Sequence, residues 1–179
     1  PAGPPRRAPP ATGTQGGVVS FEAAPGKVQL RLSVESADAD VLDTETREIA
    51  VPDLTAPDAT MATPGVFRAR TVRELQQMKS DPKAVPTATR EFTRADRVFV
   101  RVTTYGTGAA APTVSARLLN RAGQSIADLP VSELAAGDAT ARDVDLALAT
   151  LAPGEYVVEL TTTGPTEPRK EMIGFRITG

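Results

Sequence analysis

The residues that most enzymes use for catalysis are missing from this sequence. The chain of 179 residues contains neither histidine nor cysteine. A Ser-His-Asp triad, a thiol nucleophile and the usual zinc ligands are therefore excluded, which leaves carboxylate chemistry and serine–lysine pairs. The lysines fall where we expect turns, a helix end and loops: Lys27, Lys79, Lys83 and Lys170. Exposed lysines are ordinary at such places, so the sequence predicts no catalytic residue and no enzyme.

Two short motifs resemble ligand sites but have the wrong context. Asp38, Asp40 and Asp43 are crowded like the carboxylates of a calcium loop, but an EF-hand needs a glutamate at its twelfth position, where an isoleucine stands. A solvated hairpin turn is the favoured interpretation. Residues 106–111, GTGAAA, follow an expected strand, but Pro112 and another strand-like segment come next, so no helix N-terminus is available for a phosphate. We therefore expect no metal and no cofactor.

The charge balance argues against nucleic acid as a partner. Lysine and arginine total 20 against 22 acidic residues, which gives a net charge of −2. Non-specific binding to nucleic acid draws its affinity from a basic excess that this chain lacks. In addition, no apolar run approaches the roughly 20 residues that a transmembrane segment needs. Protein remains the expected partner.

Arginines are concentrated between residues 68 and 101. Acidic residues are interleaved with them, so an ion-paired, solvated strand face is favoured over an anion-binding patch. One group has the composition that is enriched in protein interfaces: Phe99, flanked by Arg97 and Arg101 on the strand face opposite a row of valines. Two interpretations stay open. Phe99 anchors an exposed interface, or it is covered by the helix expected near residues 72–80.

Strands must position these residues, because alternating apolar patterns dominate the sequence. There are 16 prolines and 14 glycines to punctuate runs rich in valine, leucine and isoleucine. Seven or eight such runs follow one another within residues 66–179, interrupted by one helical segment that Thr71 and Glu74 should cap. This spacing predicts an all-β fold, an immunoglobulin-like antiparallel β-sandwich with one short helix near 72–80.

Residues 151–160, LAPGEYVVEL, predict a half-buried strand around which the other strands of this sandwich pack. Pro153 and Gly154 predict a tight turn, after which apolar and polar side chains alternate. In many immunoglobulin-like sandwiches, a tyrosine near the start of a late strand ties that strand back to the loop before it. We expect Tyr156 to make this bond.

The rest of the chain divides into three further parts. Residues 1–17 are rich in proline and glycine and form a linker or, alternatively, an arm that docks on a neighbouring chain. Residues 18–54 predict an antiparallel β-meander, part of a sandwich, whose second strand alternates strictly over 28–34. Residues 55–65 form a proline-punctuated connector. A small meander with a single apolar face is marginal alone, so we expect it to need a partner surface.

Several segments carry a resemblance to a known family. They are VVSFEAAPGKVQLRLSVE, REIAVPDL, VFRARTVRELQQMK, VPTATREFTRADRVFVRV, SARLLNRAGQ, LAPGEYVVEL and GFRITG. In them the chain resembles the C-terminal region of von Willebrand factor A-related proteins of Acidobacteria and similar soil bacteria, over about residues 18–179. The resemblance implies an exported protein, extracellular or in the cell envelope. The metal-site motif of the A domain itself, Asp-x-Ser-x-Ser, is not in this sequence, so no functional residue carries over.

We therefore expect a non-catalytic structural module that works by protein–protein interaction. Its expected partner is itself, in a homo-oligomer or an extracellular filament built through the N-terminal arm and strand addition. The candidate interface residues are Val18, Val19, Phe21, Arg97, Phe99 and Arg101. The alternative is an accessory module that binds a ligand such as a carbohydrate. Such sites use exposed aromatic platforms, for which Tyr105 is the candidate.

Overall fold

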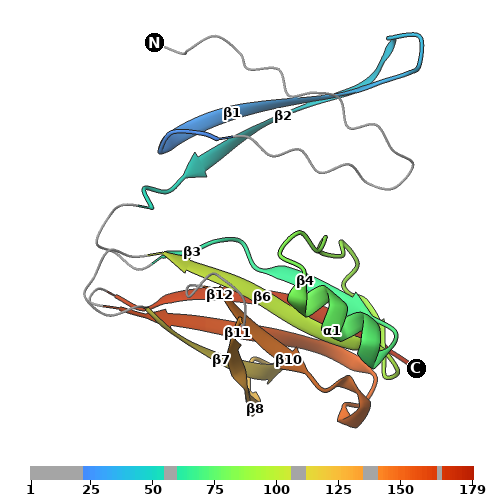
Figure 1. Ribbon diagram of the computed structural model, residues 1–179, viewed down its shortest axis with the longest axis vertical. Helices are drawn as coiled ribbons and strands as arrows, with labels where there is room; N and C mark the ends of the chain where they lie inside the picture. Colours follow the sequence, from blue (N-terminus) through green and yellow to red (C-terminus); the bar gives the residue numbers. More distant parts are fainter. Residues whose placement is uncertain (1–21, 55–59, 106–111, 135–140, 165–166) are drawn as a thin grey trace. The chain divides into compact units, whose positions relative to one another are not determined.

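The computed structural model describes residues 22–54, 60–105, 112–134, 141–164 and 167–179. These residues belong to two compact units, Pro1–Asp53 and Leu54–Gly179. The described part is an all-β fold of sandwich type with one short α-helix (Figure 1). The fold class predicted from the sequence is therefore confirmed. The expected arm, the candidate interface residues Val18, Val19 and Phe21, and the GTGAAA motif all lie outside the described residues.

The first unit is a two-stranded antiparallel hairpin within the described residues. Strand β1 (Gly26–Glu35) pairs with β2 (Val41–Val51) from Gly26 opposite Val51 to Glu35 opposite Val41. The turn between them is organised by the Ser36 hydroxyl, which accepts hydrogen bonds from the backbone N–H groups of Asp38 and Asp40 at 3.3 and 3.2 Å. Because β2 has no described neighbour beyond β1, its polar middle stays in contact with water, and residues 41–51 form one long strand.

In its described residues the second unit is a sandwich of two five-stranded sheets. In the first sheet the order of strands is β3 (Thr60–Met61), β6 (Arg97–Tyr105), β10 (Ala141–Leu146) and β9 (Val131–Glu133). The fifth strand, β4 (Gly65–Ala69), pairs with β6 as well. In the second sheet the order is β5 (Glu91–Thr93), β12 (Arg169–Thr178), β11 (Gly154–Thr163), β7 (Thr113–Asn120) and β8 (Ser125–Leu129). A short 3-10 helix, Leu148–Thr150, follows β10.

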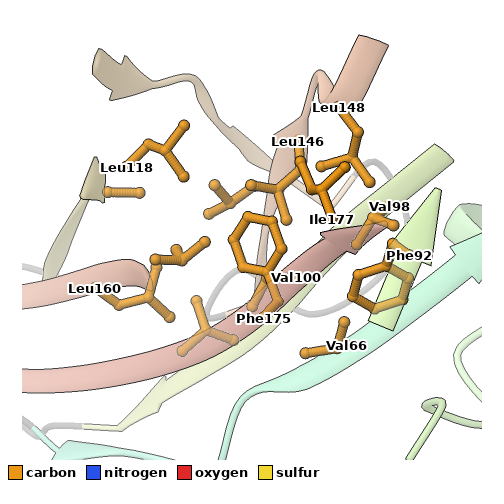
Figure 2. Packing of buried hydrophobic residues seen from close by; sticks show 14 residues of the cluster. Val66, Phe92, Val98, Val100, Leu118, Leu146, Leu148, Leu160, Phe175 and Ile177 are labelled. Carbon is orange, nitrogen blue, oxygen red and sulfur yellow. The ribbon is translucent and has the colours of Figure 1, made fainter. Parts of the chain in front are cut away.

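The core lies between the two sheets, and the alternating residues supply it. Val98, Val100 and Val102 point inward from β6, as the sequence pattern predicts, and each is at most 2% exposed. Phe175 and Ile177 meet them from β12 (Figure 2). Since fully burying one such side chain contributes roughly 1.5–3 kcal/mol, this shared interior is the main source of stability of the unit.

Two features of the sandwich differ from the sequence-based expectation. First, β5 pairs with β12 in parallel, so the second sheet is mixed and not purely antiparallel. Second, residues 126–131, which the alternation of the sequence predicts as one strand, are divided between the sheets: β8 pairs with β7 in one sheet, whereas β9 pairs with β10 in the other. Pro130 stands at the crossing, where its missing N–H costs no ladder hydrogen bond.

The expected tyrosine bond is present. The hydroxyl of Tyr156 donates to the carbonyl oxygen of Ala152, four residues upstream, at 2.9 Å. The ring of Tyr156 also stacks on Phe175, with 5.7 Å between ring centroids. This corner fixes the start of β11 against its neighbour β12.

Helix α1 (Val72–Ser80) begins as its cap predicts. The Thr71 hydroxyl accepts a hydrogen bond from the N–H of Glu74 at 3.1 Å, and the Glu74 carboxylate reaches back to the N–H of Arg70 at 2.8 Å. The return bond therefore goes one residue further back than in a standard capping box. Helical spacing predicts that Val72, Leu75 and Met78 share one face of α1. Leu75 and Met78 are half-buried, whereas Val72 is exposed.

Candidate functional site

Phe99 is buried, so it does not form an exposed interface. It is 0% exposed and lies on the face of β6 opposite the valine row. Its ring stacks on Phe67 of β4, with centroids 4.7 Å apart and an angle of 6° between the ring planes. Lys79 of α1 lies over the ring at 5.5 Å from its centroid. Figure 1 shows α1 beside β4 and β6. Of the two interpretations of Phe99, the covered one is the arrangement that is observed.

Arg101, on the same face of β6 as Phe99, links β10 to the end of α1. Its guanidinium donates two hydrogen bonds to the Asp143 carboxylate on β10, from Nε to Oδ1 at 2.8 Å and from Nη2 to Oδ2 at 3.1 Å. It also donates to the backbone carbonyls of Lys79 and Asp81 at the end of α1, at 2.8 and 3.2 Å. Cations at a helix C-terminus stabilise its unpaired carbonyls. Arg101 is therefore a structural residue.

Arg97 is the one member of this predicted trio that remains exposed. The other arginines of the region are mostly engaged: Arg68 pairs with the buried Asp96 at 2.8 Å, and Arg94 donates to the carbonyl of Ala149 at 2.7 Å. Burial opposes ionisation of Asp96. Hydrogen bonds from the backbone of Thr93 and from Arg68 outweigh that effect, and they lower the pKa of Asp96 below its ordinary value. In this region Arg68 and Arg94 therefore hold parts of the fold together, whereas Arg97 stays exposed.

Among its described residues, the first unit presents an exposed apolar surface. Because residues opposite each other in an antiparallel ladder share a face, one side of the hairpin carries six apolar residues, which we call the apolar face: Val28, Leu30, Leu32, Val34, Ile49 and Val51. Leu32, Val34 and Ile49 are 45%, 57% and 42% exposed. The opposite side of β1 is polar, with Lys27, Gln29, Arg31 and Ser33. A sheet with this contrast is built to be covered on one side.

Charged residues stand beside the leucines on the apolar face. In the ladder Arg47 is opposite Leu30, Glu45 is opposite Leu32, and Asp43 is opposite Val34. The Nε of Arg47 donates to Oε1 of Glu45 at 2.7 Å, and this hydrogen bond, together with the charge of Glu45, raises the pKa of Arg47. The sequence pattern of β1 revealed the apolar row. It could not reveal these neighbours, because the register of β2 depends on the bulge between Val34 and Glu35.

A second surface feature lies on the outer face of the second sheet. A shallow depression of about 520 Å³ is lined by arginines, glutamates and the bare backbone of Gly174, and it reaches Tyr156. Arg121 and Glu155 form an exposed ion pair at 3.3 Å. A Cβ added at Gly174 would meet no described atom within 4 Å, and the backbone there is not left-handed, so no contact in the described part of the chain requires a glycine.

Next to this depression the outer face is closed by a charge network. Glu159 accepts hydrogen bonds from Arg117 on β7, with 3.0 Å between Nε and Oε1, and from Lys170 on β12 at 3.1 Å. The bond from Arg117 contributes most to lowering the pKa of Glu159, followed by the bond from Lys170. Because these charges already satisfy one another, this part of the face offers little to a ligand.

The described residues contain no group of three or more acidic side chains that could hold a metal ion. The three aspartates of the hairpin serve its turn and strand: the carboxylate of Asp43, for example, accepts a hydrogen bond from the N–H of Thr44 at 2.8 Å. No helix in the described part of the chain is both long and apolar enough to span a bilayer. Comparisons of the chain with protein-family models and with curated proteins found no match in either set.

Proposed function

We propose that this chain is a non-catalytic structural module that acts by protein–protein contact, and that the hairpin β1–β2 is its binding element. The observation that carries the proposal is the apolar face, with Leu32, Val34 and Ile49 about half exposed. A two-stranded hairpin is at best marginally stable alone in water, whereas covering its apolar side on a partner contributes the missing burial.

The edges of the hairpin support the same function. Among the described residues β1 and β2 pair only with each other, so each is an edge strand in this part of the chain, and an edge strand can accept a further strand. Adding a strand to such an edge is a common mode of peptide and subunit recognition. A surface that binds through both a face and an edge can join more than two chains, as a filament or larger complex requires.

The proposed place of action is the outside of the cell or the cell envelope. This part rests on the resemblance of residues 18–179 to von Willebrand factor A-related proteins, which implies an export route. Within that proposal the N-terminal arm, residues 1–17, and the segment with Val18, Val19 and Phe21 are the segments that would add to a neighbouring chain.

The test is the mass and shape of the native particle, measured by light scattering and negative-stain imaging of the protein from its source. We expect a particle larger than the 18.7 kDa of one chain. The variant Leu32→Glu should reduce its mass, because it places a charge in the apolar face. Gln29→Glu, which adds the same charge to the polar side of β1, is the matched control. A native particle with the mass of one chain, or equal effects of the two variants, would contradict the proposal.

The depression on the second sheet favours a ligand-binding role as the second candidate. Gly174 leaves space in this depression, although no described contact of the fold requires a glycine there. Arg90 and Arg176 line the depression and suit an anionic or hydroxyl-rich ligand such as an acidic carbohydrate. Tyr105, the aromatic platform expected from the sequence, is half-buried on β6 in the other sheet. In a screen of glycans, one that binds in the depression should raise the melting temperature of the protein, and Arg176→Ala should abolish this increase. No shift with any glycan would leave protein contact as the only candidate.

A further inference from the structure

We propose that the occupant of the apolar face is the apolar face of a second copy of this chain, with the two hairpins packed face to face, β1 over β1, and the strands of the two copies antiparallel. This inference rests on the proposed function and adds the identity and orientation of the partner. The argument uses the register of the hairpin and the order of residues along each strand.

The apolar row of β1 is palindromic. From one end to the other it consists of Val28, Leu30, Leu32 and Val34, so the order valine, leucine, leucine, valine is the same in both directions. Consider a two-fold axis that lies between the two sheets, is perpendicular to the strands and is level with Arg31. This axis places Val28 of one copy over Val34 of the other, and Leu30 over Leu32. Self-complementarity of this kind is what a two-fold interface requires.

The charges on β2 match under the same axis. Arg47 is level with Leu30 and Glu45 with Leu32, because those pairs are opposite each other in the ladder. When the strand direction is reversed about the level of Arg31, Arg47 of one copy faces Glu45 of the second, and the contact occurs twice. Asp43 then lies opposite Ile49 at the two ends of the interface.

The alternative two-fold packing is disfavoured by the same register. An axis parallel to the strands would place β1 over β2 of the second copy, so that Leu30 would cover Arg47 and Leu32 would cover Glu45. Burying a charge against an apolar side chain carries a large desolvation cost. This packing has three such contacts per copy, including Val34 over Asp43, whereas the antiparallel packing has one, Ile49 over Asp43. The register therefore selects the antiparallel arrangement, which forms a two-layer sandwich of four strands with sheets at the usual separation of about 10 Å.

Two charge reversals in the full chain test the inference. In a dimer of Arg47→Glu, the new glutamate of each copy faces Glu45 of the other copy. In a dimer of Glu45→Arg, the new arginine of each copy faces Arg47 of the other copy. Each variant should raise the dissociation constant of the dimer by at least about tenfold, because like charges would face each other twice. An equimolar mixture should recover wild-type association as a heterodimer, since every glutamate then faces an arginine. Sedimentation equilibrium over a range of concentrations measures this.

The mixture separates contact between copies from contact within the chain. Arg47 and Glu45 also bond to each other inside one hairpin, and loss of that bond could not be repaired by a second molecule. The double variant Arg47→Glu with Glu45→Arg should associate like the wild type, and it covers the case in which a single variant folds poorly. Thr46→Glu, on the polar side between the two charges, is the matched control and should change nothing.

Three outcomes would overturn the inference: a wild-type chain that stays monomeric at all concentrations, single variants that associate normally, or a mixture that does not recover. If the native particle is large but both single variants assemble normally, only this occupant is wrong, and the proposed function stands. If the native particle has the mass of one chain, the proposed function fails as well.

Discussion

The bond between Arg101 and Asp143 gives the sharpest stability prediction. These side chains are 12% and 4% exposed, and the guanidinium also holds the last carbonyls of α1. We expect Arg101→Met to destabilise the sandwich strongly, because it leaves a buried carboxylate without its cation and the helix carbonyls without their donor. The side chains are of similar length, so the loss of packing is small.

The expected magnitudes follow from these contacts. Removing one member of a buried ion pair costs about 3–5 kcal/mol. Arg101→Met should fall at the upper end of this range, since the helix end loses its donor as well. Asp143→Ala should fall at the lower end, about 3 kcal/mol, because Arg101 keeps its two carbonyl partners. The double variant Arg101→Met with Asp143→Leu removes both charges, and it should cost less than either single loss.

Urea unfolding followed by circular dichroism measures these differences as shifts of the transition midpoint. Arg97→Met is the matched control, because Arg97 is on the same strand but exposed, and we expect it to change stability by at most about 0.5 kcal/mol. A double variant as unstable as Arg101→Met would show that packing, not charge, is the source of the effect. A cost of Arg101→Met below about 1 kcal/mol would refute the assignment of Arg101 as a structural residue.

Two further predictions concern acid and glycine. The pKa values of Asp96 and Glu159 are lower in the folded state than in the unfolded chain. Their contribution to stability is therefore complete above the ordinary carboxyl pKa of about 4 and is lost as the pH falls through their folded pKa values. Asp96→Asn and Glu159→Gln should flatten the acid side of a plot of melting temperature against pH, and an unchanged plot would contradict this. Gly174→Ala should be neutral or stabilising by up to about 1 kcal/mol, since its Cβ meets open space. Gly123→Ala should destabilise by about 1 kcal/mol, because the φ of 77° at this position disfavours a side chain. The reverse order of stability in thermal melts would show that another constraint acts on β12.

Local patterns predicted the local structure of this chain well. Alternation located β6 with its buried valines, the turn residues located the corner at Tyr156, and the cap at Thr71 located α1. Each of these features depends on residues within a few positions of one another, where backbone and side-chain preferences decide the outcome.

Pairing between distant segments could not be predicted in the same way. A period of two shows which residues share a face, but not which strand lies alongside. The parallel pairing of β5, the change of sheet at Pro130 and the register of β2 are all choices of neighbour. The same reason explains the trio around Phe99. Its composition fitted an exposed interface and an inner layer equally well, and only the position of α1 decided between them.

The pairing of β5 with β12 has a consequence for how the sandwich is made. β12 lies between β5 and β11 and supplies Phe175 and Ile177 to the core. The hydroxyl of Thr178 bonds to the carbonyl of Phe92, 86 residues earlier. During synthesis the second sheet therefore cannot close until β12 has been made and has left the ribosome. Until that moment β5, which contains Phe92, lacks its described partner strand and β11 has only β7 beside it, so the nascent chain remains open to chaperones.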